Sequence, residues 1–195
     1  MSNYRYELKF VLDQAGYSRA VSWLIMHTSA KKAHPSRFVN SVYFDDPGFS
    51  SVRDNLAGIS DRRKLRLRWY HNRQGEIISP SFEAKFRHGR LGRKDRYALK
   101  NLNQDLTKIS FRNLFSTIHH EIGEDSDFLN DAYLGTTLQV CYKRDYFAEL
   151  DGIRVTFEQQ VVFYKPLPHT KIFQSPAISY PNIVMEIKFP QTSKD

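Results

Sequence analysis

The feature that most constrains the fold of this chain is a strict alternation of charged and apolar residues in several short segments. In Lys64–Trp69 every even position is Lys or Arg, and every odd position is Leu or Trp. Similar alternation occurs in Arg5–Phe10, Phe82–Arg87, Ile153–Glu158 and Met185–Phe189. Successive side chains of a β-strand point to opposite faces of the sheet. Each segment is therefore expected to be a strand with one charged or polar face and one apolar face.

The same criterion applied along the chain predicts eight strands, one further short strand and three helices. The expected strands are Tyr4–Leu12, Phe38–Asp45, Lys64–Tyr70, Ser81–Arg87, Arg93–Leu99, Thr136–Phe147, Gly152–Gln159 and Ile183–Phe189, with Val161–Tyr164 as the short one. The expected helices are Gly16–His27 after an Asp13 cap, Phe49–Leu56, and Ser110–Ile122 with Ser110 as its cap. Four prolines between Lys165 and Pro181 predict a long irregular connection.

The charged faces suggest how these strands are arranged. For a single strand, a charged face is ordinarily the solvated side of a sheet. Five strands share the pattern here, however, and their polar faces are dominated by Arg, Lys and Glu. Their apolar faces carry residues large enough to pack against helices. We therefore expect an α+β fold in which an antiparallel eight-stranded β-barrel has a cation-lined interior and helices packed outside.

Composition sets the size and the kind of partner. The chain has 195 residues, of which 41% are hydrophobic, which predicts a single domain over 1–195. It has 29 Lys and Arg against 21 Asp and Glu, a net charge of +8, so its partner is expected to be an anion. A single cysteine, Cys141, and the lack of a transmembrane segment predict a cytoplasmic protein.

The carboxylates distinguish among the possible anions. Glu7, Glu83, Glu158 and Glu186 are expected to share faces with Lys and Arg. Carboxylates would repel the phosphates of a nucleic acid, so no specific nucleic-acid partner is expected. Mg²⁺ and Mn²⁺, in contrast, bind carboxylate oxygens together with substrate phosphates. The pattern therefore predicts metal-assisted phosphoryl transfer on a phosphate chain.

Short motifs in a fixed order give a resemblance to a known family. They are Tyr4–Phe10, Ser41–Asp45, Lys64–Tyr70, Phe82–Lys85, Lys94–Tyr97, Tyr142–Arg144, Ile153–Phe157 and Met185–Lys188. Together they resemble the VTC domain (polyphosphate polymerase) family of the triphosphate tunnel metalloenzyme, or CYTH-like, superfamily. The resemblance implies an eight-stranded tunnel in which ATP or another triphosphate extends a polyphosphate chain, with Mg²⁺ or Mn²⁺ as cofactor.

The resemblance also implies roles for residues at the matching positions. Catalytic roles fall on Lys9, Arg66, Arg68 and Lys85; phosphate binding on Lys94, Tyr142, Arg144, Arg154 and Lys188; and metal binding on Glu186 and Glu7. The implied enzyme is a polyphosphate polymerase-like phosphotransferase. The alternatives are a catalytically impaired module that binds polyphosphate or triphosphate, and an inorganic triphosphatase.

The chain departs from the family pattern at three places. Arg5 occupies the first position of the Glu-x-Glu-x-Lys motif of the wider superfamily, which favours the VTC branch. Glu158 stands where relatives usually have Asp. Relatives continue beyond the last strand to a helix and a Ser-Lys-aromatic motif. The resemblance therefore implies either that this chain is truncated or that it has lost the lysine of that motif. Ser193-Lys194 resembles that motif but lies too close to Lys188 to be the same element.

Overall fold

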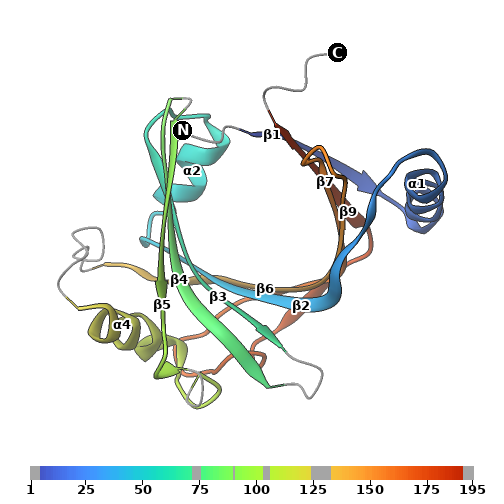
Figure 1. The fold of residues 1–195 in the computed structure, drawn as a ribbon. Helices are drawn as coiled ribbons and strands as arrows, with labels where there is room; N and C mark the ends of the chain where they lie inside the picture. Colours follow the sequence, from blue (N-terminus) through green and yellow to red (C-terminus); the bar gives the residue numbers. More distant parts are fainter. Residues whose placement is uncertain (1–4, 72–75, 90, 103–105, 124–132, 191–195) are drawn as a thin grey trace. The chain divides into compact units, whose positions relative to one another are not determined.

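A computed structural model describes residues 5–71, 76–89, 91–102, 106–123 and 133–190 (Figure 1), so Ser193-Lys194 lies outside the described residues. The described residues form nine strands and three helices. In chain order these are β1 (Arg5–Leu12), α1 (Gln14–His27), β2 (Lys31–Asp45), α2 (Ser50–Leu56), β3 (Arg62–His71), β4 (Ile77–His88), β5 (Leu91–Ala98), α4 (Phe111–Ile122), β6 (Gly135–Ala148), β7 (Arg154–Tyr164), β8 (Ala177–Tyr180) and β9 (Ile183–Pro190). The pairs β1–β9, β2–β3, β3–β4, β4–β5 and β7–β9 are all antiparallel, which confirms the predicted α+β class.

The strands belong to two compact units. Unit 1 comprises Met1–Phe38, Cys141–Val162 and Ser179–Asp195, and unit 2 comprises Val39–Val140 and Phe163–Ile178. Each unit has its own hydrophobic core. A single domain over the whole chain stays a prediction.

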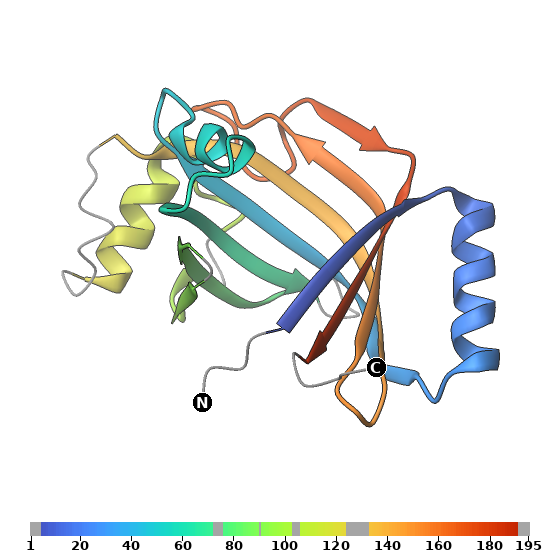
Figure 2. The same ribbon diagram turned by 90° about the horizontal axis from the view of Figure 1, so that it is seen from above.

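Unit 1 is built around a core on the apolar face of its strands. The strand order is β1-β9-β7-β6-β2, and α1 packs on this face through Leu24, which contacts the cluster of Val155, Phe157 and Ile183 (Figure 2). The carboxylate of Asp13 accepts a hydrogen bond from the Gly16 backbone N–H at 2.6 Å, so the predicted cap of α1 is confirmed. The opposite face of the same strands is left to the polar residues of the alternation.

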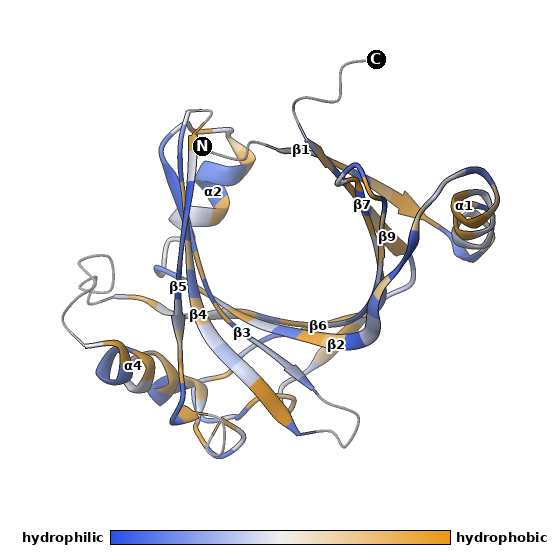
Figure 3. Ribbon diagram, in the orientation of Figure 1, coloured by the Kyte–Doolittle hydropathy of each residue, from blue (hydrophilic) through white to orange (hydrophobic). Residues whose placement is uncertain are grey.

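Unit 2 repeats this arrangement with the order β2-β3-β4-β5. Leu65, Leu67 and Trp69 of β3 are buried against Phe82 of β4. Helix α4 closes this core with an apolar stripe, and Figure 3 shows hydrophobic and hydrophilic residues on different parts of the helix. The stripe consists of Phe111, Leu114 and Ile118. The alternating residues Arg66 and Arg68 are thereby left on the other face of β3.

The observed sheet departs from the predicted eight-stranded barrel in one respect, since the described strands do not close it by hydrogen bonds. Strands β1 and β5 stand at the two ends of the hydrogen-bonded strand order, and no pairing joins them. Strand β5 carries four successive charged residues, Arg93–Arg96, and charged side chains are typical of strands that remain at a sheet edge. The sheet is therefore open in its hydrogen bonding.

Several element boundaries also differ from the prediction. Strand β2 begins at Lys31 rather than Phe38, because its first residues are an exposed extension without an apolar face. Strand β7 is continuous over Arg154–Tyr164, so the two predicted strands there are one, with Gln160 at a positive φ of 52° between them. The proline-rich connection contains the four-residue strand β8, which pairs with β7. No helix among the described residues is long and apolar enough to cross a membrane.

Candidate functional site

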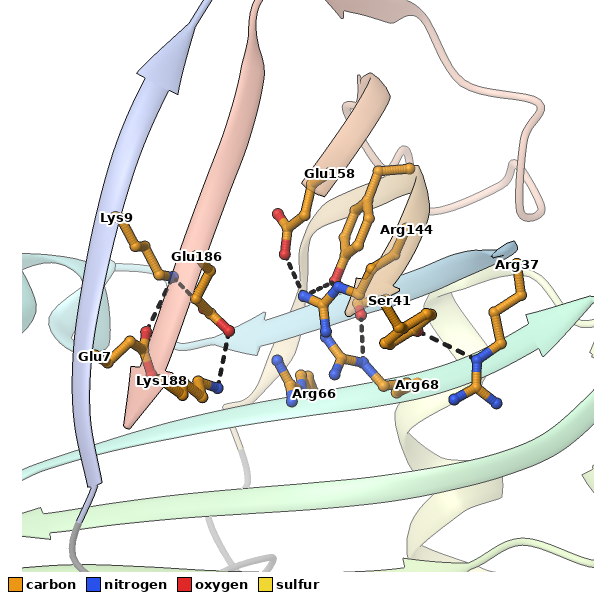
Figure 4. Close-up of polar contacts among 12 residues, drawn as sticks. Glu7, Lys9, Arg37, Ser41, Arg66, Arg68, Arg144, Glu158, Glu186 and Lys188 are labelled. Carbon is orange, nitrogen blue, oxygen red and sulfur yellow. Dashed lines mark hydrogen bonds and ion pairs between the residues drawn. The ribbon is translucent and has the colours of Figure 1, made fainter. Parts of the chain in front are cut away.

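In unit 1, two carboxylates and two lysines form a closed ring of ion pairs on adjacent strands. Lys9 Nζ lies 3.3 Å from Glu7 Oε1 and 3.3 Å from Glu186 Oε2. Lys188 Nζ lies 3.4 Å from Glu7 Oε2 and 2.9 Å from Glu186 Oε1 (Figure 4). The register explains the ring, because Glu7 is opposite Lys188 and Lys9 is opposite Glu186 in the β1–β9 pair. All four carboxylate oxygens therefore face an ammonium group.

The ring keeps the buried carboxylate of Glu186 ionised. Burial acts to raise the pKa of Glu186, but the hydrogen bond and charge of Lys188, with the charges of Lys9 and Arg144, outweigh it and lower the pKa to about 2. Burial likewise acts to lower the pKa of Lys9, and the charges of Glu186 and Glu7 raise it above its usual value. Glu186 is thus an anion at neutral pH, with lysines as its counter-ions.

A second group lies on the same face of unit 1, on β6 and β7. The Arg144 guanidinium donates to Tyr142 Oη at 3.0 Å and forms an ion pair with Glu158 (Figure 4). Thr156 lies directly opposite Glu186, and Arg154 lies opposite Lys188. Alternation along β7 places the side chains of both on the face of the ring.

Two buried polar atoms of this group have no partner. Within the part of the chain that the structure describes, Thr156 Oγ1 and Arg144 Nε are buried and make no hydrogen bond. Such atoms are uncommon in folded proteins because an unmade hydrogen bond is costly. Their place beside a carboxylate–lysine ring is consistent with a face that binds a polar ligand.

In unit 2, β3, β4 and β5 carry a second cluster centred on Glu83. Arg66 Nε donates to Glu83 Oε2 at 2.7 Å, and Lys94 Nζ donates to Glu83 Oε1 at 2.7 Å. Glu83 is only 4% exposed, so both cations offset its burial. Glu83 was one of four glutamates expected to share a face with Lys and Arg, and its two oxygens accept hydrogen bonds from Arg66 and Lys94.

The remaining predicted residues of unit 2 lie in the neighbouring rows of the same face. Arg68 is opposite Ser41 and Ser81, and its Nε donates to Ser41 Oγ at 3.2 Å (Figure 4). Lys85 is exposed and stands opposite Lys64 on one side and Lys94 on the other. Like charges directly opposite each other destabilise a sheet, so this row favours an anionic ligand.

The charge balance around Glu83 predicts a loss of stability in acid. Burial acts to raise the pKa of Glu83, but Arg66 and Lys94 outweigh it and hold the pKa below its usual value. Glu83 therefore stabilises the fold above the pKa of an unfolded glutamate, about 4.3, and this contribution is lost as the pH falls through the lower folded value. Urea unfolding at about pH 6 and about pH 3 should show a smaller loss for Glu83→Gln than for the unsubstituted protein. Parallel losses in both proteins would contradict this assignment.

The number of carboxylates that lie close together limits how many ligands the described residues can offer to a metal ion. No three His, Cys, Asp or Glu side chains among the described residues gather closely enough to hold a metal ion. Glu7 and Glu186 are the nearest match, since the same two lysines bridge them. Mg²⁺ commonly takes one or two carboxylates and completes its coordination with phosphates and water. The pair fits a metal of this kind, provided that a lysine gives way to it.

Sequence reasoning found the residue types of both clusters but missed some members. Thr156 is a polar residue in an alternating strand, and its position opposite Glu186 could not be read before the register was known. Tyr43 stands opposite Arg66. Burial acts to lower the pKa of Arg66, while interactions with Tyr43 and Glu83 raise it. Tyr43 lies within the Ser41–Asp45 motif, but the motif alone gave it no role.

Comparisons with known proteins agree with the sequence motifs. The model of the VTC domain family matches residues 4–195. A candidate adenylate cyclase from Bacillus halodurans has a similar structure, with a TM-score of 0.57 at 14% identity, over 98% of this chain and 82% of that protein. A protein from Pyrococcus horikoshii gives a TM-score of 0.51 at 11% identity, over 95% of this chain and 77% of that protein.

These comparisons bear on family and fold in different ways. No curated protein matches the chain. At 14% and 11% identity, the two solved structures establish a likeness of fold only. The family model spans nearly the whole sequence and contains all of the motifs on which the resemblance was based. The chain belongs to the VTC domain family.

Proposed function

We propose that this protein catalyses metal-dependent phosphoryl transfer from a nucleoside triphosphate, and that the transfer extends a polyphosphate chain. The observation that carries the proposal is the ring of Glu7, Lys9, Glu186 and Lys188, in which each carboxylate lies within 3.4 Å of two ammonium groups. Carboxylates can bind a metal, and ammonium groups can bind phosphate. Membership of the VTC domain family supports the proposal. A site that must bind both a divalent cation and a polyanion needs both kinds of group together.

In this proposal Glu186 and Glu7 hold Mg²⁺ or Mn²⁺. The bound metal neutralises charge on the phosphate oxygens during transfer. The lysines contribute when they leave the carboxylates, because Lys9 and Lys188 can then pair with phosphate oxygens instead. Lys9 is more than half exposed, so its side chain can change partners at little cost in packing.

The arginines and the remaining lysines bind and orient phosphate groups. Arg144 is held by Glu158 and Tyr142 and is therefore preorganised. Arg66 is fixed in the same way by Glu83, while Lys85 is exposed on the same face. Phosphoryl transfer depends mainly on such positioning and on electrostatic stabilisation. The proposed phosphate-binding set is Arg66, Arg68, Lys85, Lys94, Tyr142, Arg144, Arg154 and Lys188.

The test is incubation with ATP and Mn²⁺ followed by gel electrophoresis for polyphosphate. Polymer that forms only with metal is the expected result, and Lys85→Ala should reduce it strongly. Lys108→Ala, a lysine outside the proposed set, serves as the matched control. Release of orthophosphate without polymer would indicate a triphosphatase, and binding of ATP without turnover would indicate a binding module. Failure to bind either ATP or tripolyphosphate would overturn the proposal.

A further inference from the structure

One buried hydroxyl in unit 2 finds no hydrogen-bond partner among the residues that the structure describes. Ser81 is 1% exposed, and within the described part of the chain its Oγ makes no hydrogen bond. A buried donor without a hydrogen-bond partner lowers the stability of the fold, so each such group calls for an explanation. Ser81 lies on β4, two residues before Glu83, and alternation places both side chains on the same face.

The strand register sets Ser81 beside Arg68. Arg68 of β3 is opposite Ser81 on one side and Ser41 of β2 on the other. Ser41 is also 1% exposed and accepts the hydrogen bond from Arg68 Nε (Figure 4). One row across three strands therefore holds a guanidinium flanked by two buried hydroxyls. Both of its neighbours are neutral.

The next row along these strands has the opposite character. There Arg66 is opposite Glu83, whose carboxylate is nearly buried and takes hydrogen bonds from two cations. At the Arg66 row the carboxylate of Glu83 already offsets part of the cationic charge. At the Arg68 row the two residues directly opposite the cation, Ser41 and Ser81, are neutral. The Arg68 row thus adds hydroxyl groups to the cations of this face.

The other unpartnered atoms of unit 2 do not lie on the charged face. Asn40 Oδ1, Trp69 Nε1 and Gln139 Nε2 are also buried without partners among the described residues, and Gln139 accepts a hydrogen bond from the backbone of Phe173, whose ring contacts Trp69. Asn40 and Trp69 are opposite each other in the β2–β3 register, on the side of Leu67 and the hydrophobic core. Ser81 differs from them because it is aimed at the charged side.

We propose that the Ser81 hydroxyl donates a hydrogen bond to a non-bridging oxygen of a phosphate group held by Arg68. Ser41 accepts the hydrogen bond from Arg68 Nε and so helps to orient the guanidinium within this row. Ser81 is a positioning and specificity residue for phosphate in this assignment. The assignment rests on the proposed function, because it assumes that the face binds a triphosphate or polyphosphate.

The test is the affinity for tripolyphosphate, measured by calorimetry on the full chain. Ser81→Ala and Ser81→Cys should each weaken binding about tenfold or more, as expected for loss of a hydrogen bond to a charged group. Cysteine keeps nearly the volume of serine but is a weak donor, so agreement between the two variants excludes a cavity effect. Ser116→Ala removes a hydroxyl that is bonded within α4 and should leave the affinity unchanged.

A second readout separates ligand binding from a structural role. Without ligand, Ser81→Ala should melt at the same temperature or higher, because it removes an unsatisfied buried group and breaks no hydrogen bond. A lower melting temperature with unchanged affinity would overturn the assignment, as would unchanged affinity in both Ser81 variants. If the unsubstituted protein fails to bind tripolyphosphate, the proposed function and this assignment both fail. If it binds and only the Ser81 effect is missing, this assignment alone fails.

Discussion

Replacing Arg66 with alanine is expected to reduce phosphoryl transfer by about a hundredfold to a thousandfold, the usual cost of losing one preorganised charge-stabilising group. The Arg66 guanidinium is partly buried and is held at 2.7 Å from Glu83 Oε2. Its orientation is therefore set before a ligand arrives, and that is what makes an electrostatic contact effective in catalysis. The rate of polyphosphate synthesis from ATP and Mn²⁺ is the measurement.

The same substitution also leaves Glu83 with one cation fewer. Removing one partner of a buried ion pair typically costs about 3 kcal/mol of stability, so lost activity could reflect lost folding. The double variant Arg66→Ala/Glu83→Gln separates the two effects, because it removes the uncompensated charge. We expect the double variant to regain most of the stability in urea unfolding and to remain inactive. Recovery of activity along with stability would show that Arg66 acts only on the fold.

Replacing Glu186 with glutamine should weaken Mn²⁺ binding by at least about a hundredfold. Residues that merely support metal ligands often contribute ten- to a hundredfold to affinity, so a direct carboxylate ligand is expected to contribute no less. The amide keeps the size of the side chain and removes its charge. Titration with Mn²⁺, followed by electron paramagnetic resonance in the presence of tripolyphosphate, reports the affinity without requiring turnover.

The matched control for this prediction is Glu149→Gln. Glu149 lies in unit 1, just after β6, and takes no part in the ring of ion pairs. The Glu149→Gln variant should bind Mn²⁺ with the same affinity as the unsubstituted protein. Equal Mn²⁺ affinity in Glu186→Gln and in the unsubstituted protein would rule out Glu186 as the metal ligand. The metal would then have to bind elsewhere on the chain.

Alternation in the sequence was enough to predict which residues share a face. It correctly predicted β3 with Arg66 and Arg68 on one side and Leu65, Leu67 and Trp69 on the other. The face on which each of these side chains lies follows from the two-residue period of a strand, which is a local property. The helices α1 and α4 were found for a similar reason, since their apolar stripes are local too.

The features that the sequence did not predict depend on pairings between distant segments of the chain. The ring in unit 1 joins residues near the start of the chain to residues near position 186, and only the β1–β9 register brings Lys9 opposite Glu186. Likewise, nothing in the alternation of β4 indicates that Arg66 and Lys94 both pair with Glu83. Strand β8 was missed because prolines around it suggested irregular structure.

The order of strands in unit 1 has a consequence for biosynthesis. Strand β1 pairs with β9, so its partner is synthesised some tens of seconds later, at typical rates of about 5–20 residues per second. During that time Tyr6, Leu8 and Phe10 belong to a strand without a neighbour, and even in the finished protein they remain about half exposed. Until β9 is made, this segment of the nascent chain exposes apolar side chains that the finished sheet partly covers. Because Glu7 and Lys9 pair with Glu186 and Lys188 of β9, the proposed metal site cannot form before β9 has been synthesised.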